Sequence, residues 1–303
     1  MTAVLTTPGP ATVPGVEDEE PTVPPQRRRV PYLLLLPGLL WLAVFFLVPL
    51  VTLVSTSLQT GSLEEGYALT FHWSTYTAVW STYGDQLFRS FVYAGSATVL
   101  ALLIGYPLAY AIAFKAHRWR NLMLVLVIAP FFTSFLLRTL AWKIVLADDG
   151  WIVNTLQTLG LLSDNGRLLA TPAAVVLGLT YNFLPFMVLP LYASLEKIDP
   201  SLLEAASDLH ATPATAFRTV TWPLSLPGVV AGTLLTFIPA AGDYVNVQFL
   251  GTPNSQMIGN VIESRFLTVL DYPAAAALSI TVMTGVLILV LAYVRRVGAK
   301  ELL

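Results

Sequence analysis

The stretch PAAVVLGLTYNFLPFMVLPLYASL, residues 172–195, has no charged side chain and is long enough to cross a lipid bilayer. An α-helix rises about 1.5 Å per residue, so about 20 apolar residues span a hydrocarbon layer of roughly 30 Å. Five other long apolar stretches are Tyr32–Leu58, Phe88–Phe114, Asn121–Leu146, Leu226–Leu250 and Tyr272–Val294. The sequence therefore predicts an all-α membrane protein with six transmembrane helices.

The whole composition agrees with a membrane protein. Of the 303 residues, 55% are hydrophobic and 11% are charged, whereas a soluble domain has about 25% charged residues. The absence of cysteine excludes disulfide frameworks, thiolate metal sites and cysteine nucleophiles. A formal net charge of −2 gives no reason to expect a nucleic-acid partner.

The Lys and Arg residues predict the orientation, because cytoplasmic loops carry the positive excess. With the N-terminus inside, the cytoplasmic side holds Arg27, Arg28, Arg29, Lys115, Arg118, Arg120, Lys197, Arg218, Arg295, Arg296 and Lys300. The other side holds only Arg89, Arg138, Lys143, Arg167 and Arg265. We therefore expect both termini to be cytoplasmic.

The chain divides by composition into four segments. Residues 1–26 are acidic and rich in proline, which predicts a disordered cytoplasmic tail rather than a cleavable signal peptide. Residues 27–87 hold the first transmembrane helix and an outer loop, and residues 88–296 form the main transmembrane domain. Residues 297–303 form a short cytoplasmic tail.

The longest cytoplasmic connection includes LLEAASDLHATPATAF, residues 202–217, and local rules predict two helices there. Asp199 is an N-cap followed by a proline at the first helical position, and this helix should end near His210. Thr212, also followed by proline, should start a second, short helix that carries Phe217.

The surroundings of this connection leave two interpretations open. Pro223, Pro227 and Gly228 should break the chain before the fifth span. The small alanines beside Glu204 would let another protein approach closely, and the carboxylate would form a charged hydrogen bond to it. The alternative is an amphipathic connector lying on the membrane surface.

The connection resembles the EAA loop of ABC importer permeases. The matching residues are Glu204, Ala205, Ala206, Ala211, Phe217, Val220, Pro223, Leu224, Pro227 and Gly228. An ordered series of other stretches resembles the spermidine/putrescine permease branch of that family. These are LIGYPLAYAIA at 103–113, LLRTLAW at 136–142, LPFMVLPLYASLEKIDPSLLEAA at 184–206, FIPAAGDYV at 237–245, LGTP at 250–253 and MIGN at 257–260.

The resemblance implies a type I ABC importer permease fold in a bacterial inner membrane, with a cytoplasmic coupling helix between spans four and five. Its implied partners are a cytoplasmic ABC ATPase dimer, a second permease subunit and an extracytoplasmic substrate-binding protein. The residues implied to couple to the ATPase are Glu204, Ala205, Ala206, Asp208, His210, Ala211 and Phe217. The implied cargo is spermidine or putrescine. A phosphonate, ferric iron or another organic cation remains an alternative, as does a carrier driven by ions alone.

His210 departs from the family pattern, which has glycine six residues after Glu204. Glycine ends the coupling helix in a left-handed conformation, which costs another residue about 1 kcal/mol. His210 is therefore either a tolerated cap substitution or a contact to the ATPase.

The chain lacks chemistry of its own. It contains no Gly-Lys-Ser/Thr sequence, so it has no phosphate-binding loop and ATP must be hydrolysed by a partner. The three histidines, His72, His117 and His210, all lie in expected loops, which argues against an intramembrane Ser–His protease. We expect no metal, no cofactor and no enzymatic activity.

Polar and aromatic residues inside the spans are candidates for the substrate path, because burying polar groups in lipid is costly. Asn182 lies near the middle of the fourth span beside Tyr181, although it can equally satisfy the kink at Pro185. Asp243 and Tyr244 lie toward the outer end of the fifth span, where a carboxylate beside an aromatic ring suits an ammonium group. The alternatives for Asp243 are hydration or an ion pair with Arg138.

Overall fold

The computed structural model describes residues 30–163 and 166–297. The predicted tail at 1–26 lies outside the described residues, and so does 298–303 of the predicted C-terminal tail. The chain divides into two compact units between Leu50 and Val51, and each is described by itself.

The unit before Val51 contains a single apolar helical run. It consists of α1 (Val30–Leu42), the π-helical turn η1 (Ala43–Leu47) and the start of α2 (Val48–Ser57). The part from Leu35 to Ser57 is long and apolar enough to cross a membrane, as the sequence predicts for the first span.

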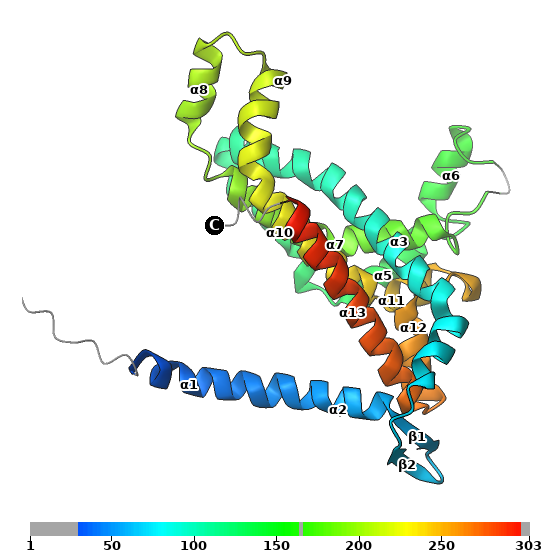
Figure 1. Ribbon diagram of the computed structural model, residues 1–303. Helices are drawn as coiled ribbons and strands as arrows, with labels where there is room; N and C mark the ends of the chain where they lie inside the picture. Colours follow the sequence, from blue (N-terminus) through cyan, green and yellow to red (C-terminus); the bar gives the residue numbers. More distant parts are fainter. Residues whose placement is uncertain (1–29, 164–165, 298–303) are drawn as a thin grey trace, which may run out of the picture. The chain divides into compact units, whose positions relative to one another are not determined.

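The unit from Val51 onward begins with the end of α2 and a hairpin of two antiparallel strands, and is otherwise helical (Figure 1). Its first half contains β1 (Gln59–Ser62), β2 (Gly66–Leu69), α3 (Ser74–Tyr110), η2 (Ala111–Lys115), η3 (His117–Trp119), α4 (Arg120–Ile128), η4 (Ala129–Phe132), α5 (Phe135–Val145) and α6 (Trp151–Thr158). Its second half contains α7 (Pro172–Leu195), α8 (Pro200–Asp208), α9 (Pro213–Ala216), η5 (Phe217–Thr221), α10 (Trp222–Ala241), α11 (Val245–Leu250), η6 (Pro253–Ser255), α12 (Ile258–Glu263), η7 (Ser264–Thr268) and α13 (Tyr272–Val297).

Among the described residues, five single helical runs are long and apolar enough to cross a membrane, and a bent pair supplies a sixth. The five are Leu35–Ser57, Ser74–Lys115, Pro172–Leu195, Pro213–Ala241 and Tyr272–Arg296. The predicted number of spans is confirmed with the bent pair counted as one. The prediction for the fourth span is confirmed at both ends.

The third predicted span is not a straight helix. Its two halves, His117–Phe132 and Phe135–Val145, meet at 97°. Thr133 and Ser134 between them have extended backbone, with ψ of 151° and 137°, so the helical hydrogen bonds cannot continue through this point. Asn121–Leu146 as one continuous helix is therefore a wrong prediction.

The second and fifth spans also differ from their predicted limits. Helix α3 begins at Ser74 rather than Phe88, because Val79 and Leu87 are buried in a cluster with Ile258 of α12 and Leu278 of α13. The part of the predicted outer loop from 74 to 87 is therefore helical. The fifth span ends at Ala241, and 245–250 forms the separate helix α11.

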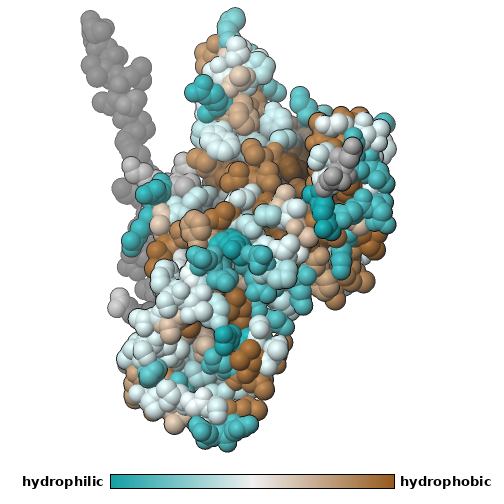
Figure 2. All heavy atoms as spheres, turned by 90° about the vertical axis from the view of Figure 1, so that its right-hand side faces the viewer, coloured by the Kyte–Doolittle hydropathy of each residue, from teal (hydrophilic) through white to brown (hydrophobic). Residues whose placement is uncertain are grey.

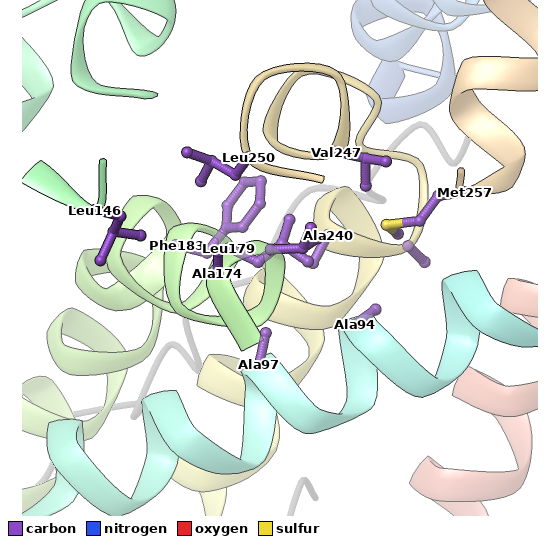
Figure 3. Packing of buried hydrophobic residues seen from close by; sticks show 12 residues of the cluster. Ala94, Ala97, Leu146, Ala174, Leu179, Phe183, Ala240, Val247, Leu250 and Met257 are labelled. Carbon is purple, nitrogen blue, oxygen red and sulfur yellow. The ribbon is translucent and has the colours of Figure 1, made fainter. Parts of the chain in front are cut away.

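The core of this unit is built where α3, α7 and α10 pack side by side. Figure 3 shows Ala94 and Ala97 of α3 facing the buried side chains of α7 and α10, such as Leu179 and Ala240. Small residues at such a crossing let helix backbones approach closely in a membrane. Position 178 of α7 accepts only glycine without a shift of its neighbours, because an added Cβ would lie 2.4 Å from Leu250 Cδ1.

Large apolar side chains also remain on the surface of the unit. Examples are Phe88, Leu103 and Ile144, which are exposed on α3 and α5. On the face seen in Figure 2, brown apolar groups are exposed over a large part of the surface, interspersed with teal polar groups. A lipid environment accepts such a surface, whereas water would not.

Candidate functional site

The connection between α7 and α10, predicted to be cytoplasmic, contains the predicted coupling helix, now α8. Asp199 is its N-cap, and its Oδ1 accepts a hydrogen bond from Ser201 N at 2.9 Å. Pro200 occupies the first helical turn, as predicted. The hydrogen bonds from the backbone and side chain of Ser201 hold the pKa of the Asp199 carboxyl below its ordinary value, so the cap stays charged.

The other end of α8 closes with a left-handed cap at the predicted position. His210 has a φ of 61°. The backbone N–H of Ala211 bonds to Ala206 O at 3.0 Å, and that of His210 bonds to Ser207 O at 2.9 Å. This pair of bonds is the Schellman arrangement that glycine usually completes. The structure thus gives His210 the backbone conformation that the family resemblance implies for it.

The predicted coupling residues of α8 differ in exposure. Glu204, Ala205 and Asp208 are exposed, and Ala206 and Ala211 are partly buried. Helices α8 and α9 project beyond the ends of α7 and α10 (Figure 1). Leu209, which the sequence does not single out as a contact, is 82% exposed at the tip of this hairpin. A small, rigid helix therefore presents a carboxylate and an apolar side chain outward.

The second predicted helix is not short, and no break follows it. Thr212 caps it as predicted, with its side chain accepting from Thr215 N at 3.3 Å. The helix then continues through η5 into α10 up to Ala241. The predicted break at Pro223, Pro227 and Gly228 is wrong. Pro223 follows closely after the π-helical turn η5, and Pro227 lies inside α10. Such local π turns and neighbouring helices satisfy the backbone groups that proline leaves unpaired in a membrane helix.

Phe217, the remaining predicted coupling residue, packs inward. Its ring lies 5.7 Å from that of Tyr106, edge to face, and 6.4 Å from that of Trp222. The Tyr106 hydroxyl in turn hydrogen-bonds to Ser225 Oγ at 2.8 Å. The side chain of Phe217 therefore anchors the hairpin to α3 and α10 rather than facing outward.

A buried polar cluster joins α5, α7 and α11. Asn182 Nδ2 donates to Asn246 Oδ1 at 2.9 Å and to Thr139 Oγ1 at 3.2 Å. The backbone N–H and the side-chain amide of Asn246 both donate to Asp243 Oδ1, at 2.8 and 3.2 Å. Asn182 and Asp243, predicted from separate spans, thus belong to one network. Thr139 was not predicted, because a threonine in a span carries no signal of its own.

The two predicted aromatic residues flank this cluster without joining its hydrogen bonds. Tyr181 is half-buried, and its ring lies 5.3 Å from that of Trp142. Tyr244 is 42% exposed beside the buried Asp243. Its backbone carbonyl accepts from Asn260 Nδ2 at 2.8 Å, which fixes its position against α12.

Arg138 is buried one helical turn after the bend, and it does not pair with Asp243. Among the described residues no ion pair includes it, and its Nε and Nη1 have no hydrogen-bond partner. Its guanidinium carbon lies 5.2 Å from the ring centroid of Phe131 and 5.6 Å from that of Phe135. The ion-pair alternative for Asp243 is therefore wrong, and aromatic faces surround the cation instead.

The chain matches the model of a protein family described as binding-protein-dependent transport system inner membrane component, over residues 81–299. It is 38% identical over 253 residues to the spermidine/putrescine transport system permease protein PotB of Escherichia coli (strain K12), covering 82% of this chain and 92% of that protein. The protein of the same name from Haemophilus influenzae is 38% identical over 256 residues, covering 84% of this chain and 90% of that one.

Solved structures show a similar fold. A bacterial ABC transporter that imports the acidic polysaccharide alginate matches with a TM-score of 0.64 at 18% identity, over 88% of this chain and 95% of its own. The MetNI methionine ABC transporter matches with a TM-score of 0.50 at 17% identity, over 71% of this chain and 95% of its own. The all-α fold expected from the resemblance is confirmed.

Proposed function

The chain belongs to the family of inner membrane components of binding-protein-dependent transport systems, and we propose that it imports polyamines such as spermidine and putrescine. It is a transmembrane permease subunit of an ABC importer. The support for polyamine cargo is the identity with two spermidine/putrescine permeases over most of both chains.

The proposed machine contains four kinds of subunit. This chain pairs with a second permease, an ATPase dimer binds on the cytoplasmic side, and a binding protein delivers cargo from outside. Both termini and the α8–α9 hairpin lie on the cytoplasmic side in this arrangement, following the positive-inside distribution of Lys and Arg.

The observation that carries the coupling role is the exposed and doubly capped helix α8. Its ends are fixed by Asp199 and by the left-handed His210, so it can move as a rigid piece. Glu204 and Leu209 then offer a charge and an apolar contact to the ATPase. ATP-driven closure of the ATPases moves α8, and the spans switch between outward and inward access.

We place the polyamine contact at Asp243 and Tyr244. Within the described residues, the hydrogen bonds to the Asp243 side chain reach Oδ1, which leaves Oδ2 to accept from a substrate ammonium. The partly exposed ring of Tyr244 adds a cation–π contact beside it. Asn182 does not contact the substrate in this proposal, but its hydrogen bond positions Asn246, which in turn holds Asp243. Tyr181 lines the path on the side of α7.

The test is spermidine uptake by the complete transporter reconstituted in liposomes. Asp243→Asn keeps an oxygen acceptor for Asn246 but removes the negative charge, so uptake should fall about tenfold while folding is retained. Asp149→Asn changes an exposed loop carboxylate and is the matched control. Unchanged uptake kinetics in the Asp243 variant would assign this carboxylate to structure alone. Transport of a phosphonate or ferric iron in place of spermidine would refute the polyamine proposal.

A further inference from the structure

Arg120, the first residue of α4, is held to the end of α7 by three contacts. It forms an ion pair with Glu196, and its Nε donates to the Tyr192 hydroxyl at 2.5 Å. Its guanidinium carbon also lies 5.1 Å from the centroid of the Tyr192 ring. Arginine supplies all three at once, because its planar group pairs with a carboxylate and stacks on an aromatic face. These three residues are called the Arg120 clamp below.

The clamp lies immediately before the coupling helix. Glu196 is the C-cap of α7, and Asp199, three residues later, is the N-cap of α8. Leu195 before Glu196 and Ile198 after it are buried in the same core cluster as Tyr192. A displacement of α8 must therefore be transmitted to the end of α7, where Arg120 contacts Tyr192 and Glu196.

At its other end, the clamp connects to the broken span. Helix α4 runs from Arg120 through η4 to the bend, and α5 continues beyond it. Helix α5 carries Thr139, which binds Asn182 in the buried polar cluster. Met123, Leu124 and Val127 of α4 pack against the same core cluster as Tyr192. Arg120 adds to this packing a polar connection between the entrance of the coupling helix and the segment that reaches the proposed substrate path.

The clamp is a poor device for stability alone. The side chains of Arg120 and Glu196 are 35% and 43% exposed, and ion pairs with that much access to water contribute little to folding. Three contacts on one half-exposed arginine are better explained by a requirement for α4 and α7 to move together.

We propose that Arg120 is a positioning residue that transmits movement of α8 to the broken span α4–η4–α5. The inference rests on the proposed function of α8 as the helix that receives work from the ATPase. Without the clamp, α8 still moves with the ATPase, but α4 and α5 no longer follow it. ATP is then hydrolysed with little transport.

The chain has no cysteine, so paired spin labels can be introduced without first replacing native cysteines in it. Labels at Ser201→Cys and Phe88→Cys report the movement of α8 relative to α3, and labels at Ile144→Cys and Phe88→Cys report that of α5; all three positions are exposed. Distances are measured in the complete transporter at rest and after trapping with ATP and vanadate. In the Arg120→Ala variant, we expect the α8 shift to persist and the α5 shift to disappear.

Arg118→Ala is the matched control, because Arg118 is an exposed neighbour whose guanidinium carbon lies 5.5 Å from the centroid of the adjacent Trp119 ring. It should retain both shifts. Uptake per ATP hydrolysed should fall about tenfold in the Arg120 variant. The double variant Arg120→Glu with Glu196→Arg should recover part of the lost uptake per ATP. The Arg120→Lys variant keeps only the positive charge, so its uptake per ATP should lie between those of Arg120→Ala and the unmodified transporter.

The outcomes separate the clamp from the proposed function. An α8 shift that is absent even in the unmodified transporter refutes the coupling role of α8. A normal α5 shift in the Arg120→Ala variant, or loss of ATPase binding by that variant, overturns the clamp.

Discussion

The coupling hairpin and the polar cluster use similar side chains in opposite surroundings. In the hairpin, Glu204 and Asp208 lie exposed on a helix fixed by its own caps. In the cluster, Asp243 and Asn246 are buried and hydrogen-bond to each other, and Asn246 also accepts from Asn182 of α7 and Thr139 of α5. The conformation of the hairpin is determined by local hydrogen bonds at its caps, and its exposed side chains are accessible to a partner. The cluster exists only once the spans have packed, so its polar groups serve the fold before they serve a substrate.

This contrast predicts that a change in the hairpin alters association, whereas a change in the cluster alters stability. Glu204→Arg should have the largest effect, because it places a cation where an anion is proposed to dock. Truncating one partner of a buried charge pair costs about 2–5 kcal/mol, so binding of the ATPase in detergent should weaken at least roughly thirtyfold. The thermal unfolding of the permease should stay unchanged.

Glu64→Arg is the control, because Glu64 is also exposed but lies in the turn of the β1–β2 hairpin. It should bind the ATPase normally. Normal ATPase binding by the Glu204 variant would remove the docking role from α8.

Asn246→Leu tests the other side of the comparison. It leaves Asp243 and Asn182 buried without their shared partner, and unsatisfied buried groups cost about 1–3 kcal/mol each. We expect the unfolding temperature in detergent to drop, with ATPase binding per folded molecule unchanged. An unchanged unfolding temperature would mean that water or lipid replaces the lost hydrogen bonds.

His210→Gly should stabilise the hairpin slightly. Glycine accepts a φ of 61° without the steric cost of a Cβ, so the gain is about 1 kcal/mol. Slower amide hydrogen exchange in residues 200–211 measures it. Weaker ATPase binding by this variant would show instead that the imidazole itself makes a contact.

The smallest expected effect is that of pH on α8. The pKa of Asp199 is lower in the folded state, so its stabilisation is present above the unfolded value of 3.8 and is lost as pH falls through the folded value. Hydrogen-exchange protection of α8, corrected for intrinsic rates, should be constant from about pH 5 to 8. A change of protection within that window would point to another titrating group.

The parts of the fold that local rules determine could be predicted from the sequence. The limits of α7 follow from an uninterrupted apolar run between a Thr-Pro start and a charged end, and the caps at Asp199 and Thr212 follow from residue type. The left-handed cap at His210 follows from the family pattern instead. The residues of α8 could be identified for the same reason. The resemblance to a family then supplied a role for them, which exposure supports.

The remaining features depend on contacts that no single stretch contains. The start of α3 at Ser74 rests on burial of Val79 and Leu87 against distant helices. The bend at Thr133 carries no strong breaker beyond a preceding proline, so its apolar surroundings suggested a straight span. The sequence offers Arg138 as an ion-pair partner for Asp243, but packing places its guanidinium against two phenyl rings.

The length of α3 has a mechanical consequence for the surface at its N-terminal end. Its 37 residues extend roughly 55 Å at about 1.5 Å each, well beyond the hydrocarbon layer. The part of α3 beyond the hydrocarbon layer is a rigid helix rather than a loop. Its buried Val79 and Leu87 pack against α12 and α13. A partner that binds at this end contacts a helix rather than a mobile loop. Less conformational entropy is then lost on association, and brief, repeated docking becomes less costly.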